Sequence, residues 1–189
     1  MYAFLISFLV IVPSEMADKT QLFALCLAAR YKKPVPILLG MFLAIVVSHL
    51  AAGEIGKLLG GFLQGNMLHL LLGLSLIGAA IWAFIPDNLD DESCETHSNH
   101  SIFIATFIGF SIAELGDKTQ LATVALAAQF HTLIPVVMGT TLGMMLVNAP
   151  AVLLSHAIAR KVPLNVVRAV SGGLFAGLGL YELSKIFYG

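Results

Sequence analysis

The chain is poor in the residues that mark soluble or secreted proteins. Only 11% of its 189 residues are charged, two are cysteine and one is tryptophan. Two cysteines are too few for a disulfide framework. A formal net charge of -1, with no basic stripe and no acidic tail, gives no sign of nucleic-acid binding. Apolar residues are abundant instead: 58% of the chain is hydrophobic and the mean hydropathy is +0.91, which predicts an integral membrane protein.

Six apolar stretches are long enough to cross a hydrocarbon core of about 30 Å as helices. They cover residues 4–29, 35–59, 67–85, 102–128, 133–157 and 166–187. Most connections between them are short, and only the polar stretch after the third is a substantial loop. The sequence therefore predicts an all-α polytopic membrane protein with six transmembrane helices.

An internal repeat divides the chain into two halves. A shift of 99 residues without a gap aligns residues 15–22 with 114–121, and it pairs Pro36 with Pro135, Gly40 with Gly139, Gly73 with Gly172 and Gly78 with Gly177. The predicted domains are a three-helix repeat at 1–86, an acidic linker at 87–101 and a second repeat at 102–189. Because three is odd, the second repeat enters the membrane inverted, an architecture in which substrate binds near the midplane between the repeats.

Two matching heptapeptides carry charge into the apolar sequence. Residues 15–21 read Glu-Met-Ala-Asp-Lys-Thr-Gln, and residues 114–120 read Glu-Leu-Gly-Asp-Lys-Thr-Gln. A charged side chain at the bilayer centre costs about 2.5 to 3.5 kcal/mol, so six independent charges would cost roughly 15 to 20 kcal/mol. Four carboxylates and two ammonium groups leave two excess negative charges, which a divalent cation would neutralise. We expect a cation site where the two motifs meet.

The predicted ligands of this site are hard oxygen donors. On continuous helices, the Glu, Asp and Lys of each motif would share one arc of about 100°. Local unwinding, favoured by Pro13 and Gly116, would add the Thr and Gln side chains. The full predicted set is Glu15, Asp18, Thr20, Gln21, Glu114, Asp117, Thr119 and Gln120. Such donors suit Mn²⁺, Ca²⁺ or Mg²⁺ better than soft metals. Lys19 and Lys118 are predicted counter-ions of the empty site.

The crowding of these carboxylates in an apolar environment predicts a link to protons. Metal entry is expected to release protons, and proton entry to release metal, which is the minimal chemistry of an antiporter. The alternative is that the same side chains only join helices to one another. Two copies at a fixed offset, each with two acids and a base, favour an ion pathway over this structural role.

Two further groups of residues are weaker candidates. His49 and Asn148 are repeat-related and fall mid-helix, so they are expected to support the carboxylates from a second layer, the alternative being an ordinary interhelical hydrogen bond. Cys94, His97 and His100 are spaced by three in the acidic linker and would form a cytoplasmic metal-sensing patch. A solvated linker is the favoured interpretation of this stretch.

The distribution of Lys and Arg predicts the orientation, because cytoplasmic loops carry the positive excess. One side of the membrane would carry Arg30, Lys32, Lys33, Arg160, Lys161 and Arg168. Lys57 and Lys185 would lie on the other side. Both termini are therefore expected outside, with the acidic linker in the cytoplasm.

The doubled pattern Glu-x-Gly-Asp-Lys/Arg-Thr/Ser, in the first and fourth of about six helices, resembles the calcium/manganese:cation antiporter family of Golgi, chloroplast and bacterial membranes. The resemblance covers essentially the whole chain, and the compact form, with Ile85-Pro86-Asp87 and the stretch 139–144, is similar to the bacterial manganese exporters. One departure is Ala17, where the family usually has glycine, and it is expected to stiffen the first motif.

The resemblance implies a bacterial inner-membrane protein that exports Mn²⁺, or Ca²⁺, in exchange for H⁺ or another cation. It implies no resident cofactor, no nucleic-acid partner and no enzymatic activity, with membrane lipid and a homo-oligomer as candidate partners. Two rivals stay open from the residues alone. A passive cation channel would use the same ligands without coupling. An intramembrane lipid pyrophosphatase would need a nucleophile and cationic phosphate ligands, and apart from the motif lysines no Lys or Arg lies deep in a predicted helix.

Overall fold

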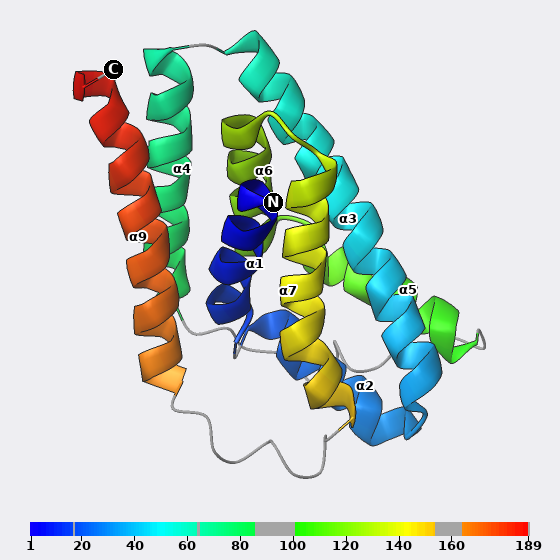
Figure 1. The fold of residues 1–189 in the computed structure, drawn as a ribbon. Helices are drawn as coiled ribbons and strands as arrows, with labels where there is room; N and C mark the ends of the chain where they lie inside the picture. Colours follow the sequence, from blue (N-terminus) through cyan, green and yellow to red (C-terminus); the bar gives the residue numbers. More distant parts are fainter. Residues whose placement is uncertain (17, 64, 86–100, 154–163, 189) are drawn as a thin grey trace.

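The computed structural model describes residues 1–189 apart from 17, 64, 86–100, 154–163 and 189 (Figure 1). Within this part every regular element is a helix, which confirms the all-α prediction. The helices are α1 (Tyr2–Glu15), α2 (Lys19–Tyr31), α3 (Pro34–Phe62), α4 (Asn66–Ala83), α5 (Ile102–Glu114), α6 (Lys118–Phe130), α7 (Ile134–Leu153) and α9 (Leu164–Tyr188). Of the described helices, α3, α4 and α7 are long and apolar enough to cross a membrane.

Two of the six predicted helices are each broken into two. The stretch 4–29 forms α1 and α2, and the stretch 102–128 forms α5 and α6. Both breaks fall inside the charged motif: Met16 and Leu115 have extended backbone, and Asp18 and Asp117 are the N-caps of α2 and α6. The arc predicted on continuous helices is therefore wrong, whereas the local unwinding expected near Pro13 and Gly116 is confirmed. The charged side chains surround a chain break instead.

The sequence contains local reasons for these breaks. Asp is a preferred N-cap, and in the second motif the Asp117 carboxylate accepts the backbone N–H of Thr119 at 3.0 Å. Gly116 has a φ of +76°, in the left-handed region that other residues avoid. A helix that begins at the Asp also directs its positive dipole end toward the carboxylates.

The first helix of each half packs on a helix of the other half. α1 lies against α7, and α5 lies against α3. Both contacts need a glycine: a Cβ atom at Gly40 would lie 2.6 Å from the carbonyl oxygen of Phe103, and one at Gly139 would clash with the carbonyl of Phe4. These residues are 99 positions apart in the chain, so the repeat seen in the sequence is also present in the packing.

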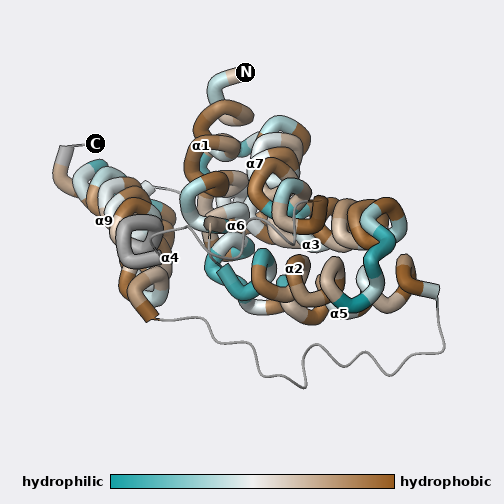
Figure 2. Tube along the Cα trace, turned by 90° about the horizontal axis from the view of Figure 1, so that it is seen from below, coloured by the Kyte–Doolittle hydropathy of each residue, from teal (hydrophilic) through white to brown (hydrophobic). Residues whose placement is uncertain are grey.

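The helices α4 and α9 form a separate pair beside this bundle (Figures 1 and 2). Gly73 and Gly179 allow the two helices to approach closely, since a Cβ atom at either would lie 3.1 or 3.0 Å from the other's carbonyl oxygen. At one end of the pair, the buried Glu182 carboxylate receives hydrogen bonds at 2.8 Å from Lys185 and across the pair from His69. The pair also contacts α1 and α6.

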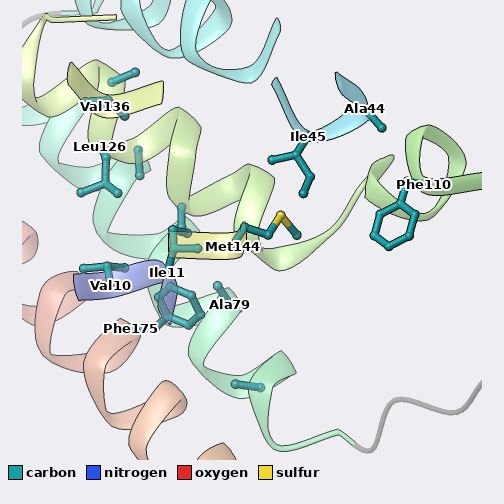
Figure 3. Close-up of a cluster of buried hydrophobic side chains, with 14 of the residues drawn as sticks. Val10, Ile11, Ala44, Ile45, Ala79, Phe110, Leu126, Val136, Met144 and Phe175 are labelled. Atoms are coloured by element: carbon teal, nitrogen blue, oxygen red, sulfur yellow. The ribbon is translucent and has the colours of Figure 1, made fainter. Parts of the chain in front are cut away.

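The apolar core joins the bundle to the α4–α9 pair. Ile11 of α1, Met144 of α7 and Phe175 of α9 are fully buried and gather with Val10 and Ala79 (Figure 3). Many large apolar side chains face outward instead, among them Leu39, Phe62, Ile81, Leu146 and Leu180. An apolar exterior of this kind suits a lipid environment.

Candidate cation site

The two chain breaks lie together in the bundle and bring three carboxylates to one place. Glu15, Asp18 and Asp117 each offer an oxygen within 4.8 Å of the others. Glu15 and Asp18 are fully buried or nearly so, and Asp117 is half-buried. Among the described residues, this is the one group of three or more metal-binding side chains. It combines both motifs, as the sequence predicted for a site between the repeats.

Glu15 is held by side chains from two helices. Its Oε1 accepts a hydrogen bond of 2.8 Å from Nδ2 of Asn148 on α7, and another from the hydroxyl of Thr20 on α2. Asn148 also donates to the carbonyl of Met144 at 3.1 Å. The carboxylate of Glu15 is thus fixed toward the chain break, next to the two aspartates.

The second motif has different contacts. Asp117 Oδ2 accepts hydrogen bonds from the N–H and the hydroxyl of Thr119, at 3.0 and 2.5 Å. Glu114 is fully buried but lies outside the three-carboxylate group. The His49 imidazole lies beside it, with 3.9 Å between Nε2 and Oε2, which is too long for a hydrogen bond. The structure therefore brings Asp117 to the group and leaves Glu114 at its edge.

The two motif lysines also differ. The ammonium group of Lys118, whose side chain is 7% exposed, forms an ion pair with Asp18 of the other motif. Lys19 is partly exposed and forms no close ion pair with a carboxylate among the described residues, although its charge acts on Glu114 from farther away. One lysine therefore neutralises the carboxylate group directly, while the other lies farther from it.

The two glutamines connect the motifs to helices of the opposite half. Gln21 donates to the carbonyl of Val147 at 3.4 Å, and Gln120 donates to the hydroxyl of Ser48 at 2.6 Å. The amide oxygen of Gln120 accepts the backbone N–H of Gly116 at 3.2 Å. In this arrangement the glutamines brace the chain breaks, and their role as metal ligands stays a prediction.

Sequence reasoning missed Ser48. Its signal in the sequence was its place next to His49 in an apolar stretch; the equivalent position in the other half is Val147, whose backbone carbonyl accepts from Gln21. The predicted patch of Cys94, His97 and His100 lies outside the described residues, and so does Ala17. The site itself offers a divalent cation carboxylate oxygens in a buried place, with one ammonium group already compensating part of their charge.

Comparison with known proteins gives an independent view of the same chain. A family model described as "Divalent cation/proton antiporter GDT1" matches residues 3–91 and 102–187. A Vibrio cholerae protein described as "Putative manganese exporter" is 43% identical over 176 residues, which is 93% of this chain and 87% of that protein. GDT1-like protein 3 of Oryza sativa subsp. japonica is 28% identical over 204 residues, or 94% of this chain and 71% of the relative. No solved structure matches.

Proposed function

The chain belongs to the GDT1 family of divalent cation/proton antiporters, and we propose that it exports Mn²⁺ from a bacterial cytoplasm in exchange for H⁺. It is an integral membrane transporter and not an enzyme, so the pyrophosphatase alternative is set aside. A passive channel is also set aside, because the family couples the metal to protons.

The observation that carries the proposal is the buried group of Glu15, Asp18 and Asp117. Three carboxylates this close repel one another unless a cation or protons compensate them. Lys118 supplies one positive charge, and a divalent metal or protons would supply the rest. Because both compensate the same carboxylates, metal and protons compete, and this competition is the basis of exchange.

We assign the other predicted residues around this group. Glu114 is proposed as a further acid of the transport cycle, and Thr20 and Thr119 as hydroxyls that orient the carboxylates. Asn148 and His49 would support the two glutamates from α7 and α3, and Lys19 and Lys118 would act as counter-ions. Mn²⁺ is proposed over Ca²⁺ because the name of the Vibrio cholerae relative refers to manganese, since oxygen donors by themselves accept either ion.

We further propose that residues 1–86 and 102–189 are inverted repeats in the bacterial inner membrane, with both termini outside and residues 87–101 in the cytoplasm. The reciprocal packing of α1 on α7 and α5 on α3 supports this architecture. Alternating access would then arise from rocking of one half against the other around the carboxylates. A homo-oligomer surrounded by lipid stays a prediction.

The test is metal uptake into inverted membrane vesicles, with Mn²⁺ and Ca²⁺ compared in the presence and absence of an acid-inside pH gradient. We expect Mn²⁺ to accumulate only with the gradient, because outward movement of H⁺ drives it. Vesicles carrying Asp117→Asn are the control and should show no gradient-driven uptake. Mn²⁺ flux that ignores the gradient, or an absence of uptake, would contradict the proposal.

A further inference from the structure

The cation site is asymmetric, although the helices around it follow the repeat. The two glutamines reach equivalent positions 99 residues apart, although Gln21 donates to the backbone carbonyl of Val147 and Gln120 donates to the hydroxyl of Ser48. The glycine contacts of α3 and α7 are symmetric in the same way. The helix contacts therefore follow the repeat, while the residues beside the glutamates do not, since Asn148 contacts Glu15 and its counterpart His49 lies 3.9 Å from Glu114. The aspartates, threonines and lysines of the two motifs are identical, so their different contacts need another reason.

Three contacts at the centre break the symmetry. Thr20 donates its hydroxyl to the glutamate of its motif, whereas Thr119 donates to the aspartate of its own. Glu15 belongs to the three-carboxylate group and its counterpart Glu114 does not. The aspartate of the first motif pairs with the lysine of the second, but the reverse pair is not formed among the described residues.

These differences are those expected if the site has two arrangements related by exchange of the repeats. In the exchanged arrangement, Thr119 would turn to Glu114 and Thr20 to Asp18. The carboxylate group would then consist of Glu114, Asp117 and Asp18. The sequence permits this exchange, because each group that moves has the same side chain at the equivalent position.

We propose that Lys118 and Lys19 alternate as the resident cation of the site. In the arrangement seen here, the Lys118 ammonium is paired with the Asp18 carboxylate, and an arriving metal must displace the ammonium. In the exchanged arrangement, Lys19 would form the equivalent ion pair with Asp117. Each lysine thus compensates the charge of the empty site while the site is open to one side of the membrane. This inference rests on the proposed transport of a divalent cation by the same carboxylates.

The simpler alternative is that the ion pair of Lys118 and Asp18 only holds α6 to the first motif. A structural tie of this kind would serve both sides of the membrane equally. Its loss would change the affinity for metal in the same direction at both faces, or would lower the amount of folded protein. The two ideas therefore differ in the sidedness of the effect.

The experiment compares Lys118→Gln with its repeat-related counterpart Lys19→Gln. The KM for Mn²⁺ is measured in inverted vesicles, which present the cytoplasmic face, and in right-side-out vesicles, which present the outer face; both are loaded with an acid lumen. Removal of the resident ammonium should lower the KM about five-fold or more, a typical size for coupling between two sites. Lys118→Gln should do so at one face and Lys19→Gln at the other, while both lower the maximal rate.

Arginine variants provide a second test, with an expected change opposite to that of the glutamine variants. Arginine binds a carboxylate through two hydrogen bonds, so Lys118→Arg should raise the KM at the face where Lys118→Gln lowers it, and Lys19→Arg should do so at the other face. Equal changes at both faces, or changes at the same face for both lysines, would overturn the proposal. A wild-type protein without Mn²⁺ transport would instead overturn the proposed function, whatever the variants do.

Discussion

The two motif segments share five of seven residues, yet the structure gives them different surroundings. In the first, Glu15 is held by Asn148 and faces the aspartates. In the second, the equivalent Glu114 lies 3.9 Å from His49, outside the carboxylate group. The comparison shows that two copies of a repeated sequence need not make the same contacts in a single conformation. The repeat determines which side chains are available, and the conformation determines which of them form the site.

The largest effect is expected from removing an aspartate of the group. Asp18→Asn and Asp117→Asn should both abolish measurable Mn²⁺ transport, because each removes a charged carboxylate oxygen from the proposed site. Asp18→Asn should also destabilise the fold more, since breaking a buried ion pair costs about 3 to 5 kcal/mol and Asp18 pairs with Lys118. Transport assays and thermal unfolding of the purified variants in detergent check this. Equal unfolding temperatures for the two variants would contradict the ion pair's contribution.

Substitutions of the two glutamates should affect metal binding and proton coupling to different extents. Glu15→Gln is expected to weaken equilibrium Mn²⁺ binding by about 10- to 100-fold, because Glu15 lies inside the carboxylate group. Glu114→Gln should weaken binding less but abolish proton-driven transport, because the site loses an acid of its cycle. Mn²⁺ electron paramagnetic resonance measures the first effect and gradient-driven uptake the second. Full, pH-dependent activity of Glu114→Gln would show that the proton-linked mechanism is wrong.

Removing the neighbour of Glu15 should reduce Mn²⁺ affinity more than removing the neighbour of Glu114. Asn148→Ala removes a hydrogen bond of 2.8 Å to a buried carboxylate, an interaction worth about 1.5 to 3 kcal/mol. His49→Ala removes a contact of 3.9 Å, so its effect on Mn²⁺ affinity should be smaller. Titration of metal binding in both variants provides the comparison. A larger loss for His49→Ala would mean that Glu114, rather than Glu15, is the better-held ligand.

The smallest effect is expected at the chain breaks themselves. Gly116→Ala adds a methyl group where no atom lies within 4 Å, so its cost comes only from the φ of +76° and should be about 1 to 2 kcal/mol. Ala17→Gly, at the equivalent position, is the matched control and should not reduce transport, because the family pattern has glycine there. Transport rates and unfolding temperatures of both variants test the pair. An unchanged Gly116→Ala protein would show that this backbone conformation is not required.

Much of the fold could be predicted from the sequence because hydropathy and repetition are strong signals. The apolar stretches located the helices, and the doubled motif contains the three carboxylates that the structure brings together, Glu15, Asp18 and Asp117. Pro13 and Gly116 indicated local unwinding, but a full chain break was harder to predict, since a continuous apolar pattern predicts a continuous helix. Asp18 and Asp117 did carry a signal, because Asp commonly begins a helix. The charge pattern was interpreted through helical periodicity, which hid that second meaning.

Other features could not have been predicted from one sequence. The exclusion of Glu114 from the carboxylate group could not be read from the glutamates themselves, because Glu114 and Glu15 are the same residue type and differ only in their contacts, with His49 and Asn148 respectively. The separate α4–α9 pair depends on glycine contacts between distant segments, such as Gly73 with Gly179, which local patterns do not specify. The bracing of Gln120 by Ser48 is likewise a contact between distant segments.

The central claim is that the same carboxylates bind metal and protons, and it is tested most directly by proton release on metal binding. Mn²⁺ is added to the purified full-length protein in weakly buffered detergent solution, and the pH change is recorded with an indicator dye. We predict that Mn²⁺ binding releases protons from the wild type and that Asp117→Asn releases none. Saturable Mn²⁺ binding to the wild type without proton release would contradict the account.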